Sequence, residues 1–121
     1  MVLVAAMNSR RSLAGLLGCT ASTSGLTATI ATAPRSEDIV VVHGDATFTN
    51  LLADSAGTLG FVDYGRAGRA DRYVDLALVA AEIQNQFGEQ WLEPLLRAYG
   101  IDLASADAGK LGFYSDLCEL F

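Results

Sequence analysis

The sequence has few of the side chains that build zinc sites and thiol-based catalytic pairs. Its 121 residues include two cysteines, Cys19 and Cys118, and one histidine, His43. The cysteines lie far apart and form no C-x-x-C pair, so neither a zinc site nor a Cys–His nucleophile is supported. We interpret both as free thiols of a reducing compartment, which predicts a cytoplasmic protein.

Basic residues are also scarce. Eight lysines and arginines stand against fourteen aspartates and glutamates, which gives a formal net charge of −6. This charge repels the phosphate backbone of nucleic acids, and no basic patch with interleaved aromatic residues occurs, so we expect no nucleic-acid partner. The negative charge instead favours cationic small molecules or magnesium-bound species as ligands.

Long apolar runs are absent as well, since no stretch of about 18 apolar residues occurs, and we expect no membrane-spanning helix. With 51% hydrophobic and 18% charged residues, the chain nevertheless has the composition of one folded domain. Residues 1–37 are largely small, hydroxylated and weakly periodic, which predicts a loosely ordered segment with a short helix over residues 2–17. The patterned domain covers residues 38–121.

Three short apolar runs predict strands in the first half of this domain. The β-branched run Ile39–Val42 is typical of a buried strand, and residues 50–53 and 59–62 form two further runs. Turn-forming residues at 54–57 separate the second and third runs, so these two are expected to form a hairpin.

The pattern then becomes helical. Apolar spacing predicts helices over residues 71–86 and 89–99, followed by Gly88 and Gly100 as terminators. Ser105 or Asp107 can cap a last helix, whose apolar face consists of Leu111, Tyr114, Leu117 and Phe121. A small sheet followed by three helices predicts an α+β fold.

Three polar residues lie at the ends of the predicted strands. Asp45 ends the stretch His43-Gly44-Asp45, Asn50 follows five residues later, and Asp63 follows the third strand. The hairpin would bring Asn50 and Asp63 together beside Asp45. Protein kinases use the same offset, with an aspartate that accepts the hydroxyl proton and an asparagine and an aspartate that bind magnesium. The alternative is that both carboxylates merely cap turns.

The region from residue 39 to the end resembles the C-terminal lobe of the aminoglycoside 3'-phosphotransferases, a mainly helical lobe of a protein-kinase-like fold. The resemblance is carried by the stretches 42–45, 61–66, 70–77, 99–101, 113–114 and 119–121, together with Asn50. It implies ATP-dependent phosphorylation of an aminoglycoside hydroxyl, and hence antibiotic resistance. It further implies ATP as donor, Mg²⁺ as cofactor, Asp45 as catalytic base, and Asn50 and Asp63 as metal ligands.

The resemblance also implies a substrate-binding set, since relatives receive a polyamine sugar with acidic groups. Glu82, Glu119 and the terminal carboxylate of Phe121 match those positions. For the two glutamates the alternative is a solvated helix face. The chain departs from its relatives at Ala81-Glu82, where they carry an Arg-Asp pair, and at Cys118, where an aspartate is common.

Three further residues are expected to support the site. His43 is predicted to hold the loop in place through hydrogen bonds and not to act as a base. Asp75 is predicted to bind the backbone of the same loop from the start of a helix. Arg66 is assigned either to the phosphate side of the site or to a plain surface ion pair.

The nucleotide-binding parts of a kinase have no counterpart here. Lys110 is the only lysine, and no glycine-rich loop precedes His43, so the strand lysine that binds ATP phosphates is missing. We therefore expect a truncated or rearranged gene and little activity of this chain alone. The alternatives are an inactive remnant, a weak Mg²⁺- or aminoglycoside-binding module, or a kinase for another small hydroxylated substrate. Apolar surface meant for a missing lobe would be exposed and prone to associate.

Overall fold

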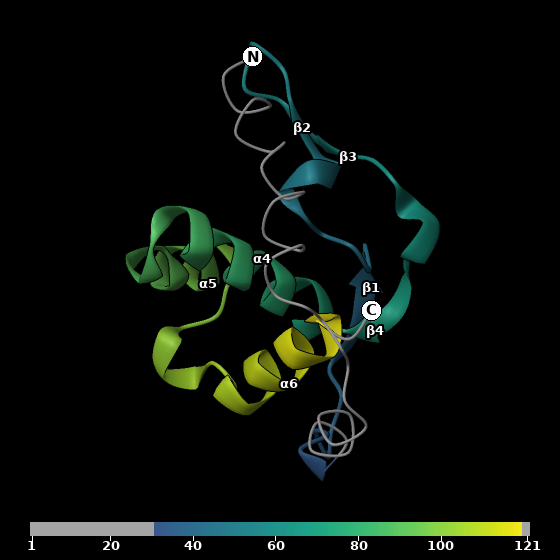
Figure 1. Cartoon of the computed structure of the whole chain (residues 1–121), viewed down its shortest axis with the longest axis vertical. Coiled ribbons are helices and arrows are strands. Elements are labelled where there is room, and N and C mark those ends of the chain that lie inside the picture. The colour runs from purple at the N-terminus through teal and green to yellow at the C-terminus, as the bar shows by residue number, and fades with distance from the viewer. Residues whose placement is uncertain (1–30, 120–121) are drawn as a thin grey trace.

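The structure is a computed structural model that describes residues 31–119 as two small antiparallel sheets followed by helices (Figure 1). The predicted α+β class is confirmed. The predicted helix over residues 2–17 and the position of Phe121 lie outside the described residues. The strands are β1 (Ile39–Val42), β2 (Leu51–Ala53), β3 (Leu59–Phe61) and β4 (Gly68–Asp71), and the helices are α4 (Tyr73–Phe87), α5 (Leu92–Tyr99) and α6 (Ala108–Glu119).

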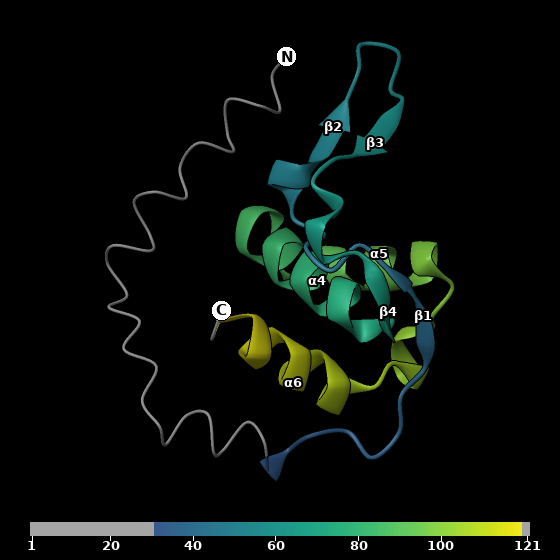
Figure 2. The ribbon, with the colours of Figure 1, turned by 90° about the vertical axis from the view of Figure 1, so that its right-hand side faces the viewer.

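The predicted hairpin is confirmed as β2 and β3, which pair Leu51 with Phe61 and Ala53 with Leu59. Its turn is closed by Asp54, whose Oδ1 accepts hydrogen bonds from the N–H groups of Ala56 and Thr58, both at 2.8 Å. The hairpin extends away from the helices (Figure 2). It therefore connects to the rest of the domain only at the end where residues 50 and 62 lie.

The second sheet contains a strand that the sequence pattern did not reveal. Strand β4 pairs antiparallel with β1, with Ile39 opposite Asp71 and Val42 opposite Gly68. Its residues, Gly-Arg-Ala-Asp, have low strand propensity, so its extended form depends on pairing with β1. The prediction that Asp71 begins a helix is wrong, because α4 begins at Tyr73.

Strand β1 is less buried than its β-branched sequence predicts. Val41 is 83% exposed and Ile39 is 42% exposed, whereas Val42 is buried. A sheet of two strands covers only a little of each side chain, so a strand of this composition keeps an open apolar face.

Helices α4, α5 and α6 enclose the core, with α4 packed against α6 (Figure 2). The buried cluster consists of Tyr73, Leu76, Ala77, Leu96 and Tyr114, and Leu111 and Leu117 of the predicted apolar face of α6 pack against it. A deviation occurs before α5, where residues 89–91 form a separate 3-10 turn that leaves Trp91 50% exposed.

The helix ends largely follow the predicted signals. Gly88 and Gly100 follow α4 and α5 with positive φ angles of 102° and 89°, and glycine adopts such angles without steric cost. Asp107 caps α6 through a 2.9 Å bond from the Lys110 N–H to Oδ1. Ser105, the alternative cap, lies in a preceding 3-10 turn instead.

A buried ion pair joins the sheet of β1 and β4 to the helices. Asp71 is 1% exposed, and its carboxylate lies 2.6 Å from Nζ of Lys110. The same carboxylate accepts hydrogen bonds from the N–H groups of Asp38 and Tyr73, both at 2.9 Å. One side chain thus connects the start of β1, the start of α4 and the first turn of α6.

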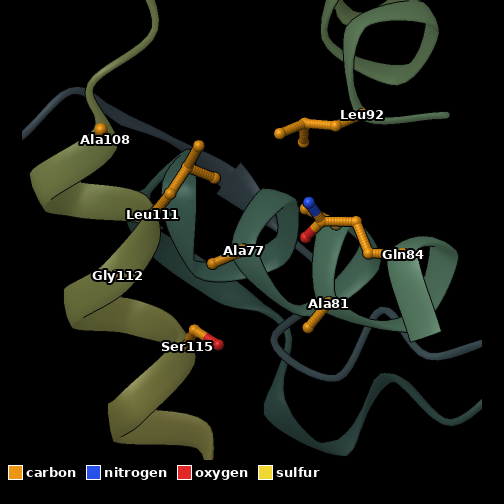
Figure 3. Close-up of a pocket in the computed structure, with 9 residues that line it drawn as sticks. Ala77, Ala81, Gln84, Leu92, Ala108, Leu111, Gly112 and Ser115 are labelled. Atoms are coloured by element: carbon orange, nitrogen blue, oxygen red, sulfur yellow. The ribbon is translucent and has the colours of Figure 1, made fainter. Parts of the chain in front are cut away.

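A hollow of about 240 Å³ lies between α4 and α6, with Leu92 of α5 at its margin (Figure 3). Its lining is mostly apolar, with Gln84 and Ser115 as the polar side chains. None of the predicted site residues lines it. The predicted residues Asp45 and Asn50 lie instead in the segment that follows β1. Among residues 31–119, no helix is long and apolar enough to cross a membrane.

Candidate active site

The loop after β1 turns sharply at Gly44. This glycine has a φ of +83°, and a Cβ added there would lie within 3.0 Å of the Arg66 backbone carbonyl. Both the left-handed backbone and the close approach exclude a side chain. Gly44 therefore lets the loop carrying Asp45 pack directly against the 3-10 turn at residues 64–66, which follows Asp63.

Asp75, in the first turn of α4, holds the start of this loop. Its Oδ2 accepts a hydrogen bond from the His43 N–H at 2.6 Å, and its Oδ1 accepts one from the Gly44 N–H at 2.8 Å. Charge-assisted bonds of this kind are stronger than neutral ones. The backbone just before Asp45 is thus tied to the most buried helix of the domain.

Asp45 and Asn50 contact each other directly. The Asn50 amide nitrogen Nδ2 donates to Oδ2 of Asp45 at 3.0 Å and to the Asp45 carbonyl at 2.9 Å. Asn50 is 9% exposed. These bonds fix the direction of the Asp45 carboxylate, and they leave Oδ1 of Asn50 as the atom available to another ligand.

Asp63 lies close to Asn50 because of the hairpin register. The Val62 N–H donates to the Asn50 carbonyl at 2.9 Å, one step beyond the Leu51–Phe61 pair. Asp63 itself adopts a left-handed backbone with φ 63°, and its side chain does not cap the 3-10 turn that follows. An aspartate tolerates this strained conformation when the surrounding structure holds it there.

His43 links the two parts of the site. Its Nδ1 accepts a hydrogen bond from the Asp45 N–H at 3.3 Å, so its Nε2 carries the proton donated to the Val62 carbonyl at 2.9 Å. The ring also packs against Phe61 and Tyr64, with centroids 5.2 Å and 4.8 Å away. With both nitrogens hydrogen-bonded, the ring joins the loop to the hairpin.

The donor set suits a magnesium ion that also binds phosphate. Residues 31–119 contain no group of three or more His, Cys, Asp or Glu side chains that could hold a metal by themselves. The oxygens available are Oδ1 of Asn50 and the carboxylate of Asp63. Magnesium in phosphate-transfer sites commonly binds one or two protein oxygens and completes its shell with phosphate and water. The two residues fit that pattern.

The predicted substrate acids are placed differently from one another. Glu82 is 4% exposed, and its Oε2 accepts a hydrogen bond from the Phe48 N–H at 2.5 Å. The Glu82 carboxylate faces the loop. It therefore lies neither on a solvated helix face nor at an exposed position of the surface. Glu119 is exposed at the end of α6, and Phe121 lies beyond the described residues.

The end of α6 lies near the loop. Packing around the Cys118 thiol raises its pKa; Arg66 counteracts this, whereas the carboxylates of Asp45 and Asp75 add to it. These charges reach Cys118 only because the last turn of α6 approaches the site. Among residues 31–119, Arg66 forms no ion pair, so the surface ion-pair alternative finds no support there.

Comparison with known proteins agrees with this geometry. Residues 20–109 match the phosphotransferase enzyme family. The chain belongs to this family. It is 39% identical over 89 residues to an aminoglycoside 3'-phosphotransferase of Niallia circulans, covering 73% of this chain and 33% of the relative. It is 41% identical over 96 residues to one from Streptomyces fradiae, covering 74% of this chain and 35% of the relative.

Solved phosphotransferases have the same fold. An aminoglycoside-3'-phosphotransferase of type VIII superposes with a TM-score of 0.70 at 37% identity, covering 81% of this chain and 39% of that one. An aminoglycoside phosphotransferase from Streptomyces rimosus, in complex with ADP and streptomycin, gives a TM-score of 0.60 at 32% identity. The match covers 80% of this chain and 36% of that one. The chain thus spans about a third of the length of the curated relatives it matches.

Proposed function

We propose that this chain carries the acceptor- and metal-binding part of an ATP-dependent phosphotransferase that acts on an aminoglycoside hydroxyl. The observation that carries the proposal is the Asp45 carboxylate, which the Asn50 amide orients. In this reaction the hydroxyl oxygen bonds to the γ-phosphorus of ATP, the bond from that phosphorus to the β–γ bridging oxygen breaks, and ADP leaves. Asp45 accepts the hydroxyl proton.

The residues around Asp45 would contribute position and charge. Asn50 Oδ1 and Asp63 would hold Mg²⁺, which when bound neutralises phosphate charge. Asp45 would orient the acceptor hydroxyl, because its carboxylate is fixed from both sides by the Asn50 amide and the anchored loop. Phosphoryl transfer depends mainly on such positioning and electrostatic stabilisation.

The acidic character of the chain supports a polyamine substrate. Several ammonium groups require several anions, and the chain has a net charge of −6. Glu119 and the terminal carboxylate of Phe121 are the proposed contacts, since α6 brings its end toward Asp45.

A second candidate function is a metal- and aminoglycoside-binding module that does not turn over ATP efficiently by itself. A specific observation favours it. Lys110 is the only lysine in the 121 residues, and it is 7% exposed and paired with Asp71. It cannot also bind the phosphates of ATP, and transfer by this chain alone is therefore expected to be slow.

A phosphate-transfer assay separates these functions. We would incubate the purified chain with γ-labelled ATP, Mg²⁺ and kanamycin, and measure labelled kanamycin for the wild type and Asp45→Asn. Slow transfer that falls by about 10²–10⁴-fold in Asp45→Asn is expected if Asp45 is the base. Transfer that is unchanged by this substitution would disprove the assignment.

Calorimetry covers the case in which no transfer is detected. Kanamycin binding that depends on the Asp45 and Asp63 carboxylates would then favour the binding module. A folded chain that binds neither Mn²⁺ nor kanamycin would contradict both functions.

A further inference from the structure

The buried carboxylate of Glu82 lies against the loop that carries Asp45 and Asn50. We propose that Glu82 is a positioning residue that fixes the far end of this loop, and that it does not bind the substrate. This inference rests on the proposed function, because the loop matters only if Asp45 and Asn50 work there. Its evidence is the contact from Oε2 to the Phe48 N–H and the 4% exposure of the residue.

Asp75 and Glu82 act from the same face of α4. They are seven residues apart, which is about two helical turns and about 10.5 Å along the axis. Asp75 accepts hydrogen bonds from the N–H groups of His43 and Gly44, on one side of Asp45. Glu82 accepts a hydrogen bond from the Phe48 N–H, on the other side. The loop is therefore anchored to α4 both before and after its catalytic candidate.

The second anchor is needed because the turn at Phe48 has no cap of its own. Residues 48–50 form a 3-10 turn that ends at Asn50, and the first N–H groups of such a turn have no partner within it. Thr47, at the capping position, makes no side-chain cap bond, and its hydroxyl pairs with that of Thr49 at 2.6 Å. Glu82 supplies the missing acceptor from a distant helix.

The contact between Glu82 and Phe48 acts on Asn50, the proposed metal ligand, through a short segment of backbone. The 3-10 turn connects Phe48 directly to Asn50, whose amide then orients Asp45. The Phe48 ring also meets Phe87 at the end of α4, with centroids 6.1 Å apart. Without Glu82 the ring contact remains, but the 3-10 turn is no longer held in one orientation. Asn50 Oδ1 then loses its fixed position.

The positioning role and the substrate-binding role make opposite predictions for two variants. Glu82→Gln removes the negative charge but keeps an oxygen that accepts a hydrogen bond from Phe48. Glu82→Leu removes the acceptor but keeps a side chain of similar size, and burying an apolar group in place of a carboxylate does not by itself unfold a domain. Glu89→Gln, which changes an exposed glutamate just after α4, is the matched control.

The experiment measures three quantities on the ¹⁵N-labelled chain: amide exchange at Phe48, Mn²⁺ affinity and kanamycin affinity. In Glu82→Leu we expect Phe48 exchange to accelerate by about 10–100-fold, the effect of losing a hydrogen bond to a charged acceptor, while core amides such as Leu96 stay protected. Mn²⁺ affinity should fall by about tenfold, as when a residue that supports a metal ligand is removed. Glu82→Gln and Glu89→Gln should stay close to the wild type in all three measurements.

Other outcomes would overturn the inference. If Glu82→Gln weakens kanamycin binding and leaves Phe48 exchange unchanged, Glu82 binds substrate. If Glu82→Leu accelerates exchange uniformly across the core, or leaves Mn²⁺ affinity unchanged, its role is only structural. Should Glu82→Leu fail to fold, Phe48 exchange in the wild type and in Glu82→Gln decides: a Phe48 amide protected in both supports the anchor, and one that exchanges as fast as an exposed amide refutes it. A wild type that binds no Mn²⁺ would instead count against the proposed function.

Discussion

At the scale of single residues, Asp63 and Gly44 have backbones that few residues tolerate. Asp63 is the non-glycine residue with a positive φ among residues 31–119, and Gly44 packs against the Arg66 carbonyl. Strained backbone of this kind costs about 1–3 kcal/mol and tends to occur at functional sites. Both residues lie where the Asp45 loop meets the segment after β3. The strain is therefore concentrated at the proposed metal site.

Replacing Asp63 by glycine separates its strain from its charge. Asp63→Gly removes the carboxylate but accepts the left-handed backbone, so we expect the free energy of unfolding to change by less than about 1 kcal/mol. Mn²⁺ affinity, measured by calorimetry, should fall at least about tenfold, or 1.4 kcal/mol. Asp116→Asn, on the exposed face of α6, is the charge control. Equal Mn²⁺ affinity in wild type and Asp63→Gly would disprove the metal-ligand assignment.

Alanine at Gly44 should destabilise the domain far more than alanine at Gly57. Both glycines have a φ of +83°, but a Cβ at Gly57 meets nothing within 4 Å, whereas at Gly44 it collides with backbone. We expect about 1–2 kcal/mol for Gly57→Ala, the cost of left-handed backbone, and at least about 3 kcal/mol for Gly44→Ala. Urea unfolding of both variants measures the difference. Similar losses would mean that the contact with Arg66 is not a constraint.

At the scale of the elements, the buried Asp71–Lys110 pair holds the small sheet to the helices. Burial by itself raises the pKa of Asp71, but the hydrogen bond from Lys110 and the backbone N–H groups of Tyr73 and Asp38 outweigh it and lower that pKa below 3.8. The hydrogen bond to Asp71 raises the pKa of Lys110 above 10.5. Strand β4, which is short and weak in propensity, ends at this pair. Its position relative to α6 depends on the pair.

The pair predicts how stability depends on pH. A carboxyl group with a lowered pKa contributes its full stability above the unfolded value of 3.8 and loses it as the pH falls through the folded value. Lys110→Met removes the partner and leaves Asp71 buried, so its pKa should rise and acid unfolding should begin at higher pH. At neutral pH we expect a loss of about 3–5 kcal/mol. Circular dichroism from pH 2 to 7 tests this. Acid unfolding curves of the wild type and Lys110→Met that coincide would contradict the prediction.

At the scale of the whole molecule, apolar surface gathers on the hairpin and on β1. Leu52, Leu59 and Phe61 of the hairpin are 52%, 65% and 43% exposed, and Val41 of β1 is 83% exposed. Isolated exposed apolar residues are ordinary, but groups of them mark interaction surfaces. The hairpin extends away from the helices (Figure 2), so its exposed side chains are accessible to another polypeptide.

The hairpin surface predicts concentration-dependent association. Replacing Leu52 and Leu59 by serine should change the free energy of unfolding by less than about 0.5 kcal/mol each, because both are largely exposed. The same changes should shift the chain toward the monomer in sedimentation velocity between micromolar and hundred-micromolar concentrations. Leu103→Ser, at a site 48% exposed outside the hairpin, is the control. A wild type that stays monomeric throughout would contradict the prediction.

Local sequence determined the elements whose signals lie within a few residues. The β-branched run of β1, the turn at Asp54 and the glycines after α4 and α5 each specify their own backbone, so these features were predictable. The five-residue offset from Asp45 to Asn50 likewise indicated that these two polar residues would meet.

Tertiary structure decided what depends on a distant partner. Strand β4 forms only because β1 offers it hydrogen bonds, and Lys110 is buried only because the Asp71 carboxylate pairs with its ammonium group. Glu82 faces the loop because Phe48 needs an acceptor. Each of these outcomes results from satisfying a polar group with one that lies more than 25 residues away. No local pattern of the chain records such a pairing.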